Sequence, residues 1–155
     1  MKIELNQKEY RNLIRAVEVG NSVYGILGDL VDGRRYKKTS LDVENLQRKL
    51  LSFAPDFDCS GMVEKYENRL ILNDEWFDKI SNDLEEYDEE TFWSELETTL
   101  GKRDFMRDIR PEEIEYISKN NWLPERINDF YQKWQDEFVS NGLDRLDIIW
   151  RGDLH

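Results

Sequence analysis

Residues 124–142 read Pro-Glu-Arg-Ile-Asn-Asp-Phe-Tyr-Gln-Lys-Trp-Gln-Asp-Glu-Phe-Val-Ser-Asn-Gly, and this stretch decides the fold class of the chain. Its large apolar side chains recur three and four residues apart, at Ile127, Phe130, Tyr131, Trp134 and Phe138. That spacing places them on one face of an α-helix. A proline suits the first turn of a helix, and the final Asn-Gly is a typical end signal. We therefore predict a helix whose aromatic face lies in the core.

The same spacing recurs along most of the chain. Asn6 with Glu9 three residues later is the pattern of a capping box, so a helix is predicted to begin there and to run to about Val31. Further helices are predicted over residues 41–53, over residues 74–84, from Asp88 to near Arg107, and from Pro111. The chain is thus expected to be mainly α.

Three segments do not follow this spacing. Residues 32–40 contain the basic run 34–38 and are predicted to form a loop, whose role the sequence leaves open. Residues 63–72 fit either a helical turn or a strand. Residues 2–5 and 143–150 alternate as β-strands do and could pair with each other. We therefore expect one helical bundle over residues 1–155, with a possible small two-stranded β pairing of the chain termini.

Length and composition favour a single folded domain. The chain has 155 residues, of which 39% are hydrophobic and 36% charged, and its five Trp, seven Tyr and seven Phe can close a core. It contains no apolar run long enough to span a membrane and no signal-peptide pattern. Cys59 is the only cysteine, which excludes an internal disulfide and favours a reducing compartment. These features predict a cytoplasmic protein.

The net charge of −12 is concentrated in the middle third of the sequence. Residues 51–100 carry fifteen acidic and three basic side chains, whereas residues 1–50 carry seven acidic and ten basic ones. Within the middle third, residues 83–97 hold eight acids and no base. Such a field repels nucleic acid and attracts cationic partners. We therefore expect a basic protein partner, no nucleic acid and no membrane, with Glu85, Glu86 and Glu89 as contact residues; the oligomeric state stays open.

Residues 56–67 fit the twelve-residue pattern of an EF-hand calcium loop. The candidate oxygen ligands are Asp56, Asp58, Ser60, Met62 through its carbonyl group, Glu64 and Glu67. Gly61 stands where such loops turn sharply. Pro55 directly before the loop disfavours an entering helix, and the pattern occurs only once. The alternative is an acidic turn in which Asp, Ser and Gly serve turn geometry.

The chain lacks the residue types that the most common catalytic sites require. The only histidine is His155, which excludes Ser-His-Asp and Cys-His catalysis and histidine-rich metal sites. Gly20 and Gly25 have the spacing of a phosphate-binding loop, but Ile26 and Leu27 follow where Lys and Ser or Thr are needed. The acidic run could supply carboxylate pairs for acid–base or metal chemistry, but like-charge runs are more typical of a solvated face. The chain is predicted not to be an enzyme.

The segment Glu86–Trp93, followed by Leu96, Leu100 and Arg103-Asp104-Phe105, resembles a family of small uncharacterised acidic bacterial proteins with a YDEExFW…L…L…RD segment. The N-terminal Leu5, Glu9, Tyr10 and Leu13 resemble the start of the same proteins. The resemblance covers about half of the chain. It implies a helical cytoplasmic protein and assigns no activity and no functional residues.

Charge and size together favour a non-enzymatic protein-binding module, namely an acidic adaptor, inhibitor or immunity-type protein that docks on a basic partner. The alternative is a calcium-binding protein that uses residues 56–67, with Ca²⁺ as its only possible cofactor. Aromatic residues outside the clear helical stripes, at Trp76-Phe77 and Asn121-Trp122, could anchor a partner if they are exposed.

Overall fold

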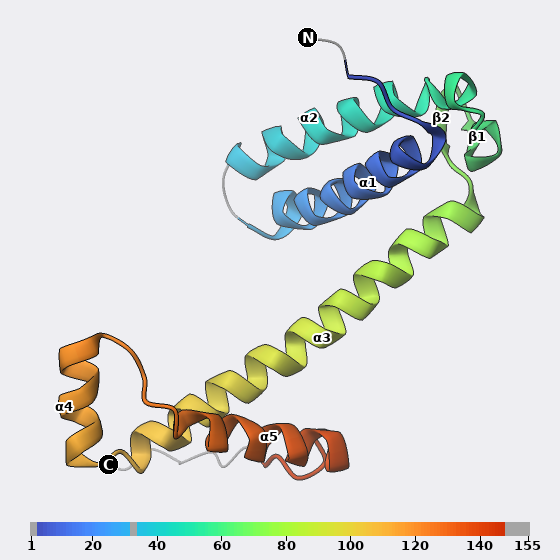
Figure 1. The fold of residues 1–155 in the computed structure, drawn as a ribbon. Helices are drawn as coiled ribbons and strands as arrows, with labels where there is room; N and C mark the ends of the chain where they lie inside the picture. Colours follow the sequence, from blue (N-terminus) through green and yellow to red (C-terminus); the bar gives the residue numbers. More distant parts are fainter. Residues whose placement is uncertain (1–2, 32–33, 148–155) are drawn as a thin grey trace, which may run out of the picture. The chain divides into compact units, whose positions relative to one another are not determined.

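The structure, a computed structural model, describes residues 3–31 and 34–147 and is mainly α, as expected (Figure 1). Its elements are α1 (Gln7–Leu30), α2 (Arg34–Leu51), two short 3₁₀ turns η1 (Ala54–Phe57) and η2 (Ser60–Met62), β1 (Val63–Tyr66), β2 (Arg69–Leu72), α3 (Asp74–Arg107), α4 (Pro111–Asn120) and α5 (Ile127–Asn141). No helix in the described part is long and apolar enough to cross a membrane.

The contacts between residues divide the chain into two compact units, residues 1–86 and residues 87–155. The N-terminal part of α3 belongs to the first unit and the rest to the second. The expectation of one domain, which came from chain length, stays a prediction.

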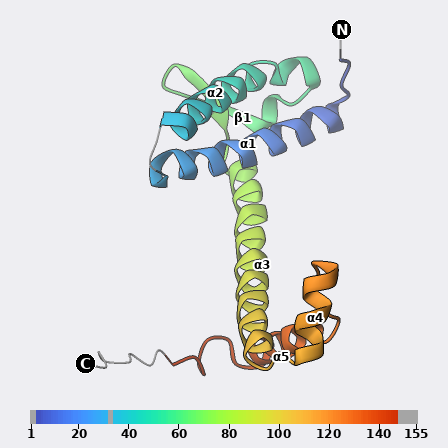
Figure 2. The same cartoon turned by 90° about the vertical axis from the view of Figure 1, so that its left-hand side faces the viewer.

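In the first unit, α1 and α2 lie side by side (Figures 1 and 2). The predicted capping box is present: Asn6 Oδ1 accepts from the Glu9 backbone N–H at 3.0 Å, and Glu9 Oε2 accepts from the Asn6 N–H at 2.8 Å. Between the helices, the buried Glu18 carboxylate accepts a hydrogen bond from Gln47. Burial raises the pKa of Glu18 above its usual range, although this hydrogen bond opposes the shift.

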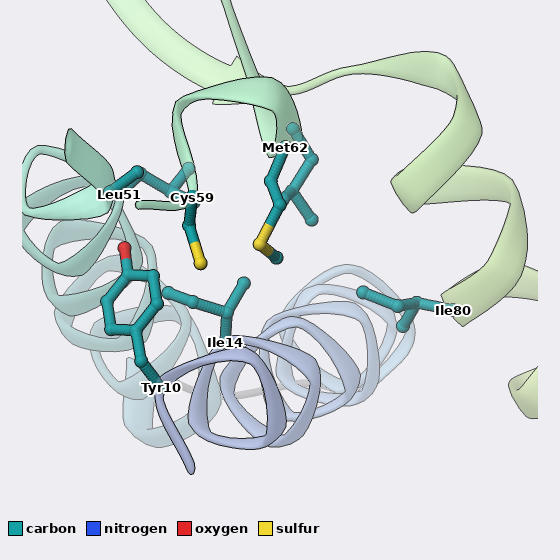
Figure 3. Packing of buried hydrophobic residues seen from close by; sticks show 8 residues of the cluster. Tyr10, Ile14, Leu51, Cys59, Met62 and Ile80 are labelled. Carbon is teal, nitrogen blue, oxygen red and sulfur yellow. The ribbon is translucent and has the colours of Figure 1, made fainter. Parts of the chain in front are cut away.

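The core of the first unit is built from α1, the end of α2, the 3₁₀ turns, β2 and α3. Figure 3 shows how its side chains point toward one another. Its buried members are Tyr10, Ile14, Leu51, Ala54, Cys59, Met62, Leu72 and Ile80. The Tyr10 ring stacks on Phe57 at 4.3 Å, and its hydroxyl group donates to the Leu50 carbonyl at 2.7 Å. Burial raises the pKa of Tyr10 to about 12, so the hydroxyl stays protonated and keeps donating.

The small sheet is a local hairpin, and the predicted pairing of the termini is wrong for the residues that the structure describes. Strands β1 and β2 pair antiparallel, with Val63 opposite Leu72. Residues 3–5 and 143–147 contain no strand, and residues 2 and 148–150 lie outside the described residues. The hairpin settles the ambiguity of residues 63–72 in favour of strands. A two-residue turn closes a far shorter loop than pairing of the termini, so its entropy loss is smaller.

Two helix boundaries differ from expectation. The basic run 34–38, predicted as a loop, belongs to the first turns of α2. The two helices predicted over 74–84 and from Asp88 are the single helix α3. Asp88 is a residue type that often caps a helix, which favours a new helix there. No Gly or Pro interrupts residues 74–100, however, so an unbroken helix through Asp88 is also possible, and it is the one observed. Like charges four residues apart oppose a helix by only about 0.2–0.5 kcal/mol per pair, too little to break it.

In the second unit, Arg126 holds the end of α3, the start of α4 and the start of α5 together. Its guanidinium donates to both carboxylate oxygens of Glu113, at 2.7 and 2.8 Å, and to Asp108 Oδ2 at 2.8 Å. It also lies over the rings of Phe105 and Phe130, 5.2 and 5.1 Å from their centroids. The hydrogen bonds from Arg126 lower the pKa of Glu113 to about 2.

The aromatic faces of the second unit are only partly core. Phe138 and Ile127 are buried as predicted, whereas Trp134 is half-buried and donates from Nε1 to Asp104 Oδ2 at 3.0 Å. Phe92 has helical spacing to Leu96 and Leu100, which favours a place in the core, but its side chain is exposed. Helices α3 and α5 approach closely at Gly101, where an added Cβ atom would lie 2.5 Å from Tyr131 Cδ1 and 3.1 Å from the Tyr131 backbone nitrogen.

We predict that Gly101→Ala destabilises the protein by about 1–3 kcal/mol, because the new methyl group meets backbone atoms that cannot move away independently. Gly25→Ala is the matched control, since Gly25 is also inside a helix but an added Cβ there has no neighbour within 4 Å. This control should gain up to about 1 kcal/mol from helix propensity. Chemical denaturation measures both, and equal effects would contradict the close approach of α3 and α5.

A second prediction concerns the stability of the protein at low pH. The pKa of Glu113 falls from 4.5 to about 2 on folding, so the ionised carboxylate stabilises the protein above pH 4.5, and this stabilisation is lost as the pH drops toward 2. Glu113→Gln should therefore lower the free energy of unfolding at pH 7 and flatten its fall between about pH 5 and pH 2. Unfolding curves across this range measure the slope. An unchanged slope in the variant would show that another group causes it.

Candidate functional site

The acidic segment of α3, residues 83–97, is the predicted partner site, and most of it is exposed. Residues 85–92 form eight consecutive exposed positions of one helix. A helix turns once every 3.6 residues, so this stretch is uncovered on all sides. The three predicted contact residues, Glu85, Glu86 and Glu89, all lie within it. The structure therefore leaves these carboxylates accessible.

The charges of this segment are almost uncompensated. Asp83, paired with Arg15 at 3.2 Å, is the only one of its acids for which the described residues provide an ion pair. Glu85 and Glu89 are four residues apart on α3, as are Glu86 and Glu90, so like charges repel along the helix. A cationic surface placed against this segment would relieve that repulsion.

The loop 56–67 does not have the fold of an EF-hand. Residues 56 and 57 end η1, residues 60–62 form η2, and Glu64 lies on strand β1 where an EF-hand continues toward its second helix. Glu67 lies in the hairpin turn with φ of 53°. The resemblance of residues 56–67 to an EF-hand loop is therefore one of sequence and does not extend to the structure. As the Pro55 signal indicated, the preceding helix ends early, at Leu51.

The candidate calcium ligands do not converge. Asp56, Asp58, Ser60, Glu64 and Glu67 are exposed, whereas the Met62 side chain is buried and its carbonyl accepts from the Asn73 N–H at 3.0 Å. Within residues 3–31 and 34–147, no three Asp, Glu, Cys or His side chains are grouped so that they could hold a metal ion. Asp58, with φ of 53°, ends η1, and its carbonyl accepts from Gln7 at 2.9 Å. These contacts serve the turn, and calcium binding stays a prediction.

An apolar groove of about 670 Å³ lies in the second unit between α4, the segment that follows it, and α5. Tyr116, Ile117, Trp122, Leu123 and Tyr131 are among the residues that line it. The sequence singled out Trp122 as a possible anchor, and its side chain is exposed. The positive φ of Asn121 turns the chain at this point. Trp76, the other candidate, is half-buried with Lys79 Nζ 5.1 Å from its ring centroid, while Phe77 is exposed.

No protein-family model, curated protein or solved structure matches this chain in the comparisons made. The resemblance to small acidic bacterial proteins therefore stays a prediction, and the site is argued from its own residues.

Glu67→Gly tests the two interpretations of the loop together. Glu67 has a positive φ at the first position of a two-residue hairpin turn, where glycine avoids a penalty of about 1–2 kcal/mol but gives back part of the gain in backbone entropy. We expect the variant to be more stable than the natural chain without calcium. Thermal unfolding measures this, and Asn68→Gly, where no positive φ occurs, is the control.

The same measurement with added Ca²⁺ decides the calcium hypothesis. If the loop is a site, Ca²⁺ at ten times its dissociation constant adds about 1.4 kcal/mol to the natural chain and nothing to Glu67→Gly or Glu67→Gln. No thermal shift of the natural chain at millimolar Ca²⁺ would end that hypothesis.

Proposed function

We propose that this chain is a non-enzymatic, acidic protein-binding module, of the adaptor, inhibitor or immunity type, that docks on a basic protein partner through residues 83–97 of α3. One observation carries the proposal: residues 85–92 are helical yet exposed on every side, and four of them are glutamates. A polar helix segment of this kind gains nothing from core packing, so its acidic surface is available for another molecule.

The electrostatics of the segment support a cationic partner. Eight acids and no base fall within fifteen residues, and their charges are concentrated on a single helix. Complementary charge accelerates association and suppresses binding of wrong partners. A Lys or Arg side chain of a partner could also bind two neighbouring carboxylates at once, such as those of Glu86 and Glu90, and so offset their mutual repulsion.

The same field disfavours nucleic acid, because phosphates would meet like charge. A reducing compartment such as the cytoplasm fits Cys59, which is a free, buried thiol. The proposal of a binding role rather than catalysis also follows from the residue types present, since the only histidine is the last residue of the sequence.

Reversal of the three contact charges tests the proposal. Glu85→Lys, Glu86→Lys and Glu89→Lys combined should leave the fold stable, because all three side chains are exposed. Partners captured from an extract of the source cells are identified, and the association rate of each is measured at low and at physiological salt. We expect the natural chain to associate at least about tenfold faster at low salt than the triple variant does.

The control changes the same number of charges elsewhere. Glu64 on β1, Glu115 on α4 and Asp144 in the turn after α5 are exposed, so their combined replacement by Lys alters the net charge equally without touching the acidic segment. This control should associate faster than the triple variant of α3. Equal rates for both variants would mean that net charge alone acts, and unchanged rates for both would contradict the docking role of residues 83–97.

A further inference from the structure

Helix α1 carries a second apolar stripe, on the side away from α2. Its members are Ala16, Val19, Val23, Ile26 and Leu30, spaced three, four, three and four residues apart. This is the a/d spacing of a coiled-coil seam. Ala16 is exposed, and the exposed fractions of Val23, Ile26 and Leu30 rise along the helix from 39% to 56% and 79%. The stripe is thus apolar, regular and largely uncovered in the first unit.

The contacts of α1 explain why α2 does not cover it. The residues of α1 that meet α2 include Tyr10, Glu18, Asn21 and Gly28. At 100° per residue they point to the opposite side of the helix from the stripe. The first turns of α3 lie beside the N-terminal half of α1, where Asp83 pairs with Arg15. Of the stripe, only Val19 packs against the core cluster.

We propose that this stripe is a dimerisation surface, on which α1 of a second copy of the chain packs antiparallel. This inference goes beyond the proposed function and does not depend on it. In such a pair the stripe meets itself reversed: Val23 lies opposite Val19 of the second copy, and Ile26 lies opposite Ala16 of the second copy. The small Ala16 thus faces the larger Ile26, and the two valines face each other, so the side chains can interdigitate.

The positions that flank the stripe are complementary in the same reversed arrangement. Arg15 faces Asp29 of the second copy, and by symmetry Asp29 faces its Arg15. On the other flank, Leu13 faces Leu27 of the second copy, and Gly20 faces Gly20 across the two-fold axis, where the absence of a side chain lets the helices approach. Flanking charges set the partner and the direction of paired helices.

This self-complementarity is the reason to assign a second copy rather than another protein. Opposite charges meet on one flank and apolar residues meet at the Ile26 and Val23 levels, while Leu30 reaches Asn12 at the end of the seam. A two-fold interface uses the same patch on both subunits in this way. Arg15 and Asp29 already have partners within the chain, Asp83 at 3.2 Å and Lys37 at 2.9 Å. Both pairs are exposed, so each charge can be shared with a second neighbour at little cost.

The seam covers two heptads, so we expect a weak dimer, with a dissociation constant on the order of micromolar. Sedimentation equilibrium of the full chain over a range of concentrations measures it. Ile26→Glu places a carboxylate in the seam and should abolish the dimer. Val139→Glu is the matched control, because Val139 is 82% exposed on α5, and it should leave the dimer unchanged.

Charge exchange tests the direction and the identity of the partner together. In a dimer of Arg15→Asp, the new Asp at position 15 faces Asp29 of the second copy, so each dimer contains two repulsive acidic pairs. In a dimer of Asp29→Arg, two repulsive basic pairs form at the same places. Each variant alone should dimerise at least about tenfold more weakly than the natural chain. Mixed together, the two variants restore both opposite-charge pairs and should form a heterodimer of near-natural affinity. Circular dichroism of each variant checks that the monomer is folded.

A chemical crosslink fixes the register. In the variant Ser22→Cys, the new cysteines of the two copies lie opposite each other in the antiparallel pair, and a short bifunctional maleimide should join them. In Ile26→Cys, the two cysteines lie about 15 Å apart along the helix axis, so the same reagent should not join them. The native Cys59 is buried. Parallel packing would reverse this result.

Three outcomes would overturn the proposal. One is a natural chain that stays monomeric at about 1 mM, where a complex with a dissociation constant of about 10 µM would be almost fully formed. Another is a monomer that Ile26→Glu destabilises, which would assign the stripe to a contact within the chain. The third is a dimer that Ile26→Glu and the charge variants leave unaffected, which would place the interface elsewhere.

Discussion

Burial at the two ends of α3 is the constraint on which the structure depends. Near its N-terminus, Ile80 completes the core of the first unit, and near its C-terminus the fully buried Phe105 lies under the guanidinium of Arg126. Tertiary packing supplies most of the stability of a helix in water. The middle of α3 has no such packing at residues 85–92 and carries repelling glutamates, so it depends on helix propagation from the two packed ends.

Local signals in the sequence predicted the elements that local interactions decide. The capping box of Asn6 and Glu9, the helix from Pro111 and the aromatic helix that stops at Gly142 are all present, because caps and periodicity act within a few residues. The helix boundary predicted at Asp88 is wrong because two local signals compete there. Asp88 is a good cap residue, but it is also tolerated inside a helix, and the sequence alone does not decide between these uses. Residues 63–72 fit either a helical turn or a strand because their apolar residues do not alternate strictly, and the hairpin of the structure shows them to be strands.

The exposure of the candidate contact residues was predictable because it follows from their charge. Like charges repel and stay hydrated, so exposure of Glu85, Glu86 and Glu89 followed from composition. The loop 56–67 shows the opposite case, since ligand spacing says nothing about whether a helix or a strand follows, and here β1 follows. The stripe on α1 is hard to recognise in the sequence, because Tyr10 and Ile14 of the same helix pack inward and a helix with two apolar faces looks like one broad apolar face.

The two proposed surfaces differ in chemistry and so can act without competing. The α1 stripe is apolar with paired opposite charges, which suits a self-complementary contact, whereas the α3 segment has a single sign of charge and repels its own copy. Dimerisation through α1 would nevertheless serve docking through α3. Each dimer carries two acidic segments, and a partner with more than one basic site gains avidity, by about 10²–10⁴ where the geometry lets both segments engage. A weak dimer and a weak charge contact, each modest alone, would then bind a basic surface tightly and in proportion to the concentration of the chain.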